Sequence, residues 1–136
     1  MVKGILADAN CDGHWQALLT ALTSGTWREY WVSLNLPTHS FADHALLAEA
    51  SDRVVWQTCQ REQLILVTSN RNAKGPDSLE AVLRELNTGD SLPVITLADP
   101  DRILHERTYA DRAAFRLLDL LFDMERRRGS DRLFIP

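Results

Sequence analysis

Oxygen-bearing polar side chains follow two apolar segments of this chain. Asp8 and Asn10 come directly after residues 5–7, and the run Thr68-Ser69-Asn70-Arg71-Asn72 comes after residues 64–67. In a parallel α/β sheet the carboxyl ends of neighbouring strands open on one crevice, where such sheets bind their ligands. The spacing therefore predicts a ligand-binding crevice built from carboxylate and amide groups, with four residues at its centre: Asp8, Asn10, Asn70 and Asn72.

Motifs for several other chemistries are missing from the sequence. It contains no glycine-rich phosphate loop before a helix, no Cys-x-x-Cys pair and no Gly-x-Ser-x-Gly turn. The commonest nucleotide-binding, zinc and serine-hydrolase sites are therefore excluded. The formal net charge of -4 also argues against a broad basic surface that grips nucleic acid through its phosphates. Any contact with nucleic acid would have to be local or assisted by a metal.

The elements expected to carry this crevice alternate between strand and helix. Continuous apolar runs typical of buried parallel strands occupy residues 2–7, 64–68 and 93–97. Aromatic and β-branched residues predict another strand over residues 27–36, and residues 133–135 would add an edge strand. Apolar residues at helical spacing predict helices over residues 11–22, 40–50, 79–86, 101–109 and 110–126. Ser51-Asp52 is the N-cap signal of one more helix. This alternation predicts a single α/β domain, residues 1–136, with a mostly parallel twisted sheet between two helical layers.

Composition supports an ordinary globular domain. Hydrophobic residues make up 45% of the chain and charged residues 25%. No apolar run approaches the roughly 20 residues of a membrane span, and the first residues are too short an apolar run for a signal peptide, so a cytoplasmic location is expected. In such a reducing compartment Cys11 and Cys59 are expected to be free thiols.

Three segments, taken in order along the chain, resemble those of PIN-like nuclease domains. Asp8-Ala9-Asn10 falls where short prokaryotic PIN-like proteins have Asp-Glu-Asn at the end of the first strand. Ser51-Asp52 falls on the Ser-Asp that starts the helix before their central strand, and residues 67–72 fall on Val-Thr-x-Asp-x-Asp at the end of that strand. The resemblance covers residues 2–72.

This resemblance implies a metal-dependent site. In the family these acids hold one or two divalent metals that activate water for phosphodiester cleavage, and Mg²⁺ or Mn²⁺ prefers such oxygen ligands. We therefore expect Asp8, Asp52 and Asn70 to be catalytic. The metal ligands are expected to be these three residues together with Asn72 and Asp99. The side chains expected to line the crevice are those of Asn10, Thr68, Ser69 and Arg71. Both late acids of the family are Asn here, and each lost charge removes attraction for the cation. Asp77, Glu80, Asp99 or Asp101 could supply a replacement acid, Asp99 best because it follows a predicted strand.

Two functions follow from the resemblance. One is a divalent-metal-dependent ribonuclease or a weakened relative of one. The other is a catalytically inactive PIN-like module that binds RNA or a protein partner through the same crevice, and the Asn pair favours it. Because many PIN domains are toxins that pair with an inhibitor, a protein inhibitor is a possible partner. A homodimer through the apolar stripe of residues 110–124 is another, although the chain's own core can equally use that stripe.

Each of these residues also has a structural interpretation. Asp8 and Asp52 can be helix caps, and the two Asn residues can be turn formers. The histidines His14, His39 and His44 lack the spacing of a metal site. The run Arg126-Arg127-Arg128, with Arg132 nearby, can be a solvated helix end that favours cations.

Overall fold

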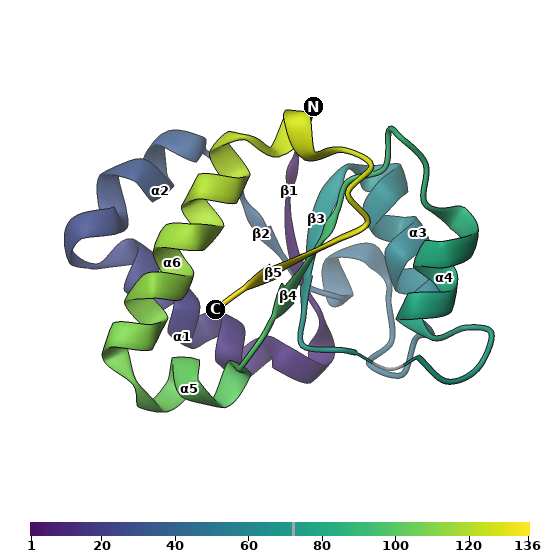
Figure 1. Ribbon diagram of the computed structural model, residues 1–136, viewed down its shortest axis with the longest axis horizontal. Helices are drawn as coiled ribbons and strands as arrows, with labels where there is room; N and C mark the ends of the chain where they lie inside the picture. Colours follow the sequence, from purple (N-terminus) through teal and green to yellow (C-terminus); the bar gives the residue numbers. More distant parts are fainter. Residues whose placement is uncertain (72) are drawn as a thin grey trace.

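A computed structural model describes residues 1–71 and 73–136 (Figure 1). Within them lies a five-stranded sheet in which every neighbouring pair is parallel, in the order β2-β1-β3-β4-β5. The strands are β1 (Gly4–Ala7), β2 (Thr38–His39), β3 (Leu64–Thr68), β4 (Val94–Leu97) and β5 (Arg132–Ile135). The predictions of a parallel α/β sheet and of a last edge strand are confirmed.

Helices cover both faces of this sheet, which gives three layers (Figure 1). Alternate residues of each strand point to opposite faces, so Ile5 and Ile65 pack against α1 and α6 while Leu6 and Leu66 pack against α3 and α4. The helices are α1 (Asp12–Thr23), α2 (Arg28–Leu34), α3 (Asp52–Glu62), α4 (Leu79–Leu86), α5 (Pro100–His105) and α6 (Arg107–Phe122), with short 3₁₀ turns η1 (Ala9–Cys11), η2 (Gly25–Trp27), η3 (Ala42–His44) and η4 (Met124–Arg127).

The prediction of a strand over residues 27–36 is wrong, because this segment forms η2 and α2. Trp27, Trp31 and Leu34 pack against the core, and their spacing of four and three residues is helical. Trp31 meets Trp15 of α1 edge to face, with ring centroids 6.4 Å apart. Tyr30 lies on the other face of the helix and is 55% exposed. Helical periodicity and one buried face therefore override the β-propensity of the aromatic and β-branched residues.

The helix predicted over residues 40–50 is reduced to the single turn η3. Ser40 and Asp43 form reciprocal bonds across this turn: the Ser40 N–H donates to Asp43 Oδ2 at 2.8 Å, and the Asp43 N–H donates to Ser40 Oγ at 3.3 Å. Ala45 then takes a left-handed conformation with φ of 56° and closes the turn with its N–H on the Ala42 carbonyl. Leu46 is thereby directed toward the core that includes α3. A short helix is stable only when it packs against the rest of the protein, and residues 40–50 form a single helical turn instead.

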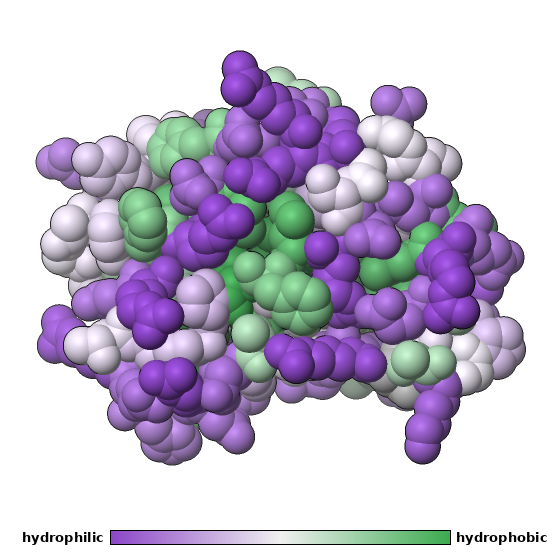
Figure 2. Space-filling view, viewed as in Figure 1, coloured by the Kyte–Doolittle hydropathy of each residue, from purple (hydrophilic) through white to green (hydrophobic). Residues whose placement is uncertain are grey.

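The two last helices break earlier than predicted. The chain leaves the helical conformation at Glu106, so α5 ends at His105, and it leaves it again at Asp123, so α6 ends at Phe122. The apolar stripe of residues 110–124 lies inside the chain's own core, where Ala113, Leu117 and Leu120 are fully buried. In Figure 2 apolar side chains gather near the middle of the face that carries β5, and hydrophilic ones surround them. None of the described helices is both long and apolar enough to span a bilayer.

Candidate functional site

The site lies where the strand order reverses. β1 sits between β2, the next strand along the chain, and β3, and helices from the two crossovers lie on opposite faces of the sheet. Ligands of open α/β sheets bind outside the carboxyl ends of the strands at such a point. The Asp8 N–H donates to the Val67 carbonyl at 2.8 Å, which holds the residue after β1 against the end of β3. The predicted proximity of these two strand ends is confirmed.

A chain of hydrogen bonds joins two carboxylates at this point. Thr68 Oγ1 donates to Asp8 Oδ2 at 2.8 Å and accepts from the Asn70 N–H at 3.0 Å. The side-chain amide of Asn70 donates through Nδ2 to Asp52 Oδ2 at 2.9 Å. The four residues Asp8, Thr68, Asn70 and Asp52 therefore form one connected cluster, and they come from the ends of two strands and from the start of α3.

The two carboxylates repel each other electrostatically. Burial raises the pKa of Asp8 from its usual value, and the negative charge of Asp52 raises it further, while the hydrogen bond from Thr68 acts in the opposite direction. The main-chain amides of Asn10 and Ala9 also lower it, but neither makes a capping hydrogen bond with Asp8. The negative charge of this site is therefore only partly compensated by its neighbours, which favours a proton or a metal cation.

Helix capping does not account for the position of Asp52. The N-cap of α3 is Ser51, whose Oγ accepts from the Val54 N–H at 3.3 Å. Asp52 is the first helical residue, so its carboxylate stays at the positive end of α3, where a negative charge is favoured, and meets Asn70. Ser78 caps α4 in the same way, also at 3.3 Å. The first turn of α3 therefore contributes to the cluster directly through Asp52, and that of α4 is linked to it through Glu80 and Arg132.

Arg132 completes the arrangement from the first residue of β5. Its Nη1 donates to the main-chain carbonyl of Asn70 at 2.7 Å and to Thr96 Oγ1 at 2.8 Å. Its Nη2 lies 2.6 Å from Glu80 Oε1, and its side chain is only 6% exposed. Sequence reasoning missed this role and grouped Arg132 with the basic run of residues 126–128. The available signal was its position at the start of a strand on the same face as Thr96.

Asp99, the acid expected to replace a missing ligand, lies outside this cluster. It caps α5 by accepting from the Arg102 N–H at 3.4 Å. Burial raises the pKa of Tyr109, and the negative charge of Asp99 raises it further. The other acids considered have partners as well: Asp77 pairs with Arg53, Asp101 lies beside His14, and Glu80 pairs with Arg132. Of these acids, Glu80 is linked to the cluster, through Arg132.

The remaining residues predicted to belong to the site differ in their exposure and in their partners. Ser69 is half-buried between Thr68 and Asn70, and Asn10 is exposed in η1. Arg71 is exposed and turns toward the start of α5, where Nη2 donates to the Ala98 carbonyl at 2.7 Å and the guanidinium lies over Phe134. Asn72 lies outside the described residues.

Cys11 lies beneath the site, and its burial disfavours the thiolate form that a nucleophile needs. Its thiol contacts the Asp8 and Val67 carbonyls at 3.5 Å, and burial together with the Asp8 charge raises its pKa to about 12. Cys59 is also buried, with a pKa of about 12 for the same two reasons. Both cysteines are free, as predicted.

The histidines and the basic run have local partners. His39 and His44 share a hydrogen bond of 3.0 Å between Nδ1 and Nε2. Asp123 lies within ion-pair distance of Arg126 and Arg127, and Arg128 pairs with Glu125. The run is therefore a local ion-pair network around η4.

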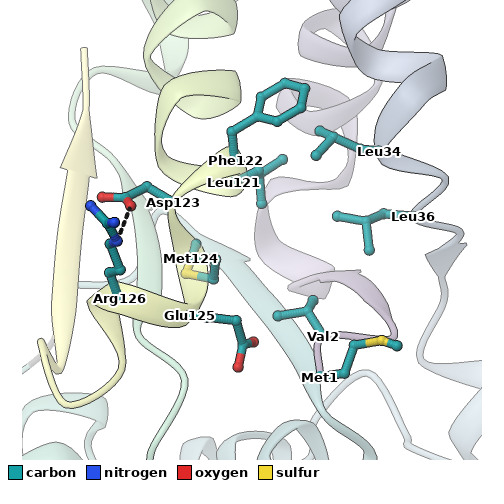
Figure 3. Close-up of a pocket in the computed structure, with 10 residues that line it drawn as sticks. All are labelled: Met1, Val2, Leu34, Leu36, Leu121, Phe122, Asp123, Met124, Glu125 and Arg126. Carbon is teal, nitrogen blue, oxygen red and sulfur yellow. Dashed lines mark ion pairs between the residues drawn. The ribbon is translucent and has the colours of Figure 1, made fainter.

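Two hollows help to locate the chemistry. One of about 440 Å³ is lined by Ala7 and Ala9, on either side of Asp8, and by Asp12, Gln16 and His39 among others. It adjoins the cluster on the β2 side. A second hollow, of about 320 Å³, lies at the amino end of the sheet around Val2 and is lined mainly by apolar side chains (Figure 3). The first hollow is lined by the two chain neighbours of Asp8, and neither Asp8 nor Asp52 lines either of the two hollows.

The donor set suits one hydrated hard cation. Mg²⁺ usually binds proteins through one or two carboxylates, keeps several waters and takes further oxygens from substrate phosphate. Asp8 and Asp52 provide two such carboxylates, and the pKa of Asp8 is raised, first by burial and then by the negative charge of Asp52. Over residues 1–71 and 73–136 no group of three or more His, Cys, Asp or Glu side chains could hold a metal. The cluster thus fits a weak two-carboxylate site and not a closed metal cage.

Comparisons with protein-family models, with curated proteins and with solved structures give no match to this chain.

Proposed function

We propose that this protein is a PIN-like domain that binds one divalent cation, Mg²⁺ or Mn²⁺, at Asp8 and Asp52 and cleaves RNA weakly. The observation that carries the proposal is the hydrogen-bonded cluster that joins both carboxylates at the switch point of the sheet. Its residues are those on which the resemblance to PIN-like nucleases depends. A crevice in this place is where a sheet of this kind binds its ligand.

The residues of the cluster have distinct roles in this proposal. Asp8 and Asp52 hold the cation, which when bound supplies an activated water and neutralises phosphate charge. Thr68 fixes the orientation of the Asp8 carboxylate, and Asn70 fixes that of Asp52. The hollow beside Asp8 offers room for a nucleotide next to the scissile phosphate.

Weak activity follows from the charge of the site. A unit charge 4 Å from another contributes about 4 kcal/mol at an effective dielectric constant of 20, before desolvation is subtracted. Replacing two family acids by Asn70 and Asn72 removes two such charges. We therefore expect millimolar rather than micromolar affinity for Mg²⁺ and slow cleavage.

A second candidate is a binding module without catalysis. It is favoured by one observation: the Asn70 amide already donates to Asp52 where a cation would otherwise compensate that charge. Such a module would bind RNA or a protein partner, such as an inhibitor, through the same crevice. The family resemblance offers both candidates, and metal binding separates them.

The deciding experiment is a calorimetric titration of the purified protein with Mn²⁺ and Mg²⁺, paired with cleavage of a fluorescent single-stranded RNA. Asp8→Asn should abolish both signals. Asp90→Asn is a matched control, because Asp90 is exposed in the turn before β4, away from the cluster. Absence of metal binding by the wild type, with RNA binding lost in Asp8→Ala but not in Asp90→Asn, would favour the binding module. Cleavage that survives Asp8→Asn would refute the site altogether.

A further inference from the structure

A buried guanidinium fixes the loop that carries Asn70. The last paired residues of β3 and β4 are Thr68 and Thr96. Asn70 comes two residues later, beyond the ladder, and its N–H donates to Thr68 Oγ1 at 3.0 Å. Arg132 holds its carbonyl, since its Nη1 donates both to the Asn70 carbonyl at 2.7 Å and to Thr96 Oγ1 at 2.8 Å. One guanidinium nitrogen therefore joins the loop to the sheet.

Glu80 determines where this guanidinium can lie. Its Oε1 is 2.6 Å from Arg132 Nη2, and it belongs to the first turn of α4. A buried arginine needs an acid and hydrogen-bond acceptors, because its charge loses the solvation of water. Arg132 thus has one acidic neighbour, 2.6 Å from Nη2, and two neutral acceptors that both bind Nη1, while Nε and Nη2 make no hydrogen bond within the described residues. A lysine ammonium is a point charge on a flexible stem, so it keeps the charge without holding a donor at the position of Nη1.

We infer that Arg132 is a positioning residue that holds Asn70 in the conformation from which its amide reaches Asp52. The contacts run from Arg132 to the Asn70 carbonyl, and from the Asn70 amide to Asp52 Oδ2 at 2.9 Å. For cation binding the inference rests on the proposed function, whereas for the geometry of Asn70 it stands on these contacts. The last strand of the sheet is thereby coupled to the two carboxylates.

Arg128 is a matched control for this role. It is also largely buried, with a side chain 17% exposed, and it also combines an acid with neutral acceptors: Glu125, the Asp90 carbonyl and Gln63 Oε1. None of these residues belongs to the cluster. Arg128→Met and Arg132→Met therefore each remove a largely buried guanidinium from an acid that is more exposed, and only the second releases the Asn70 carbonyl.

The test uses two measurements on the wild type, Arg132→Met, Arg132→Lys and Arg128→Met. The first is the NMR resonance of the Asn70 side-chain amide in the metal-free protein, with Asp52→Asn to identify the shift caused by that hydrogen bond. The second is the Mn²⁺ dissociation constant. Both Arg132 variants should move the amide resonance toward that of a solvated asparagine and weaken Mn²⁺ binding about tenfold, the usual effect of removing support behind a metal ligand. Arg128→Met should leave both unchanged.

The outcomes separate the two proposals. A folded Arg132→Met protein with the wild-type Asn70 resonance overturns the inference, whatever its affinity for Mn²⁺. If Arg132→Met does not fold, the same resonance in Arg132→Lys decides. If the wild type binds no Mn²⁺, the proposed function fails, while a shifted Asn70 resonance in the Arg132 variants alone still supports the positioning role.

Discussion

Asn70→Asp tests whether the cluster is a cation site that has lost an acid. In the wild type the Asn70 amide donates to Asp52 Oδ2 at 2.9 Å. The substitution removes a hydrogen bond to a charged acceptor, worth about 1.5–3 kcal/mol, and brings a third carboxylate against Asp52. Like charges about 4 Å apart repel by about 4 kcal/mol at an effective dielectric constant of 20, and small movements relieve part of this. We expect the metal-free variant to lose about 3 kcal/mol of unfolding free energy.

Added cation should reverse this loss. The same carboxylate that destabilises the metal-free protein attracts Mn²⁺, so the affinity should rise at least about tenfold, which corresponds to about 1.4 kcal/mol. Because binding to the folded state stabilises it, millimolar Mn²⁺ should raise the unfolding free energy of Asn70→Asp more than that of the wild type. The assay is urea unfolding in EDTA and in excess MnCl₂, followed by tryptophan fluorescence.

Asn87→Asp is the control for this experiment. The Asn87 amide is part-buried and donates to the Gly129 carbonyl at 3.1 Å, in a region remote from the carboxylates. This variant should lose stability equally in EDTA and in MnCl₂. If Asn70→Asp behaves in the same way, with no recovery in Mn²⁺, Asn70 does not lie at a cation site and the reasoning from charge is refuted.

Three further predictions concern the same cluster. The pKa of Asp8 is raised above 3.8 in the folded state, so the stability that Asp8 contributes is complete below that pH and is lost as the pH rises through the folded pKa. Metal-free Asp8→Asn should therefore be more stable than the wild type at neutral pH, and a lower urea midpoint for the variant would contradict this. Thr68→Val leaves Asp8 Oδ2 and the Asn70 N–H without their buried partner, so the unfolding free energy should fall by about 1–3 kcal/mol, whereas a loss below about 0.5 kcal/mol would show that the hydroxyl is dispensable. With its pKa near 12, Cys11 should react with a thiol reagent at mildly alkaline pH only after unfolding, and rapid labelling of the folded protein would show that its burial is incomplete.

The strands that carry the site could be predicted because their sequences allow one interpretation. Residues 64–68 form an uninterrupted apolar and β-branched run, and such a run fits a strand that is buried on both faces. Parallel order predicts only that the carboxyl ends of β1 and β3 lie at one edge of the sheet; that the two strands are neighbours was an additional assumption, which the pairing confirms. Ser51-Asp52 was recognised as a cap signal because a short polar side chain before an apolar helical pattern has this use in many proteins, and the structure assigns the cap to Ser51.

Other parts depend on contacts that no local pattern contains. The aromatic residues of α2 have high β-propensity, and only their packing against α1 and α6 selects the helix. Asp99 followed the end of a strand as expected, but Pro100 starts a helix there and Asp99 caps it. Arg132 reaches Asn70 across 62 residues of sequence. Its partners are set by which strands become neighbours, and that arrangement follows from the whole sheet.

The position of Arg132 near the end of the described chain has a consequence for biosynthesis. A nascent chain that has emerged from the ribosome only as far as η4 already contains Asp8, Asp52 and Asn70. It lacks β5, and so the guanidinium that holds the Asn70 carbonyl. The Asn70 carbonyl therefore gains this partner only after residue 132 has left the ribosome and β5 has joined the sheet beside β4.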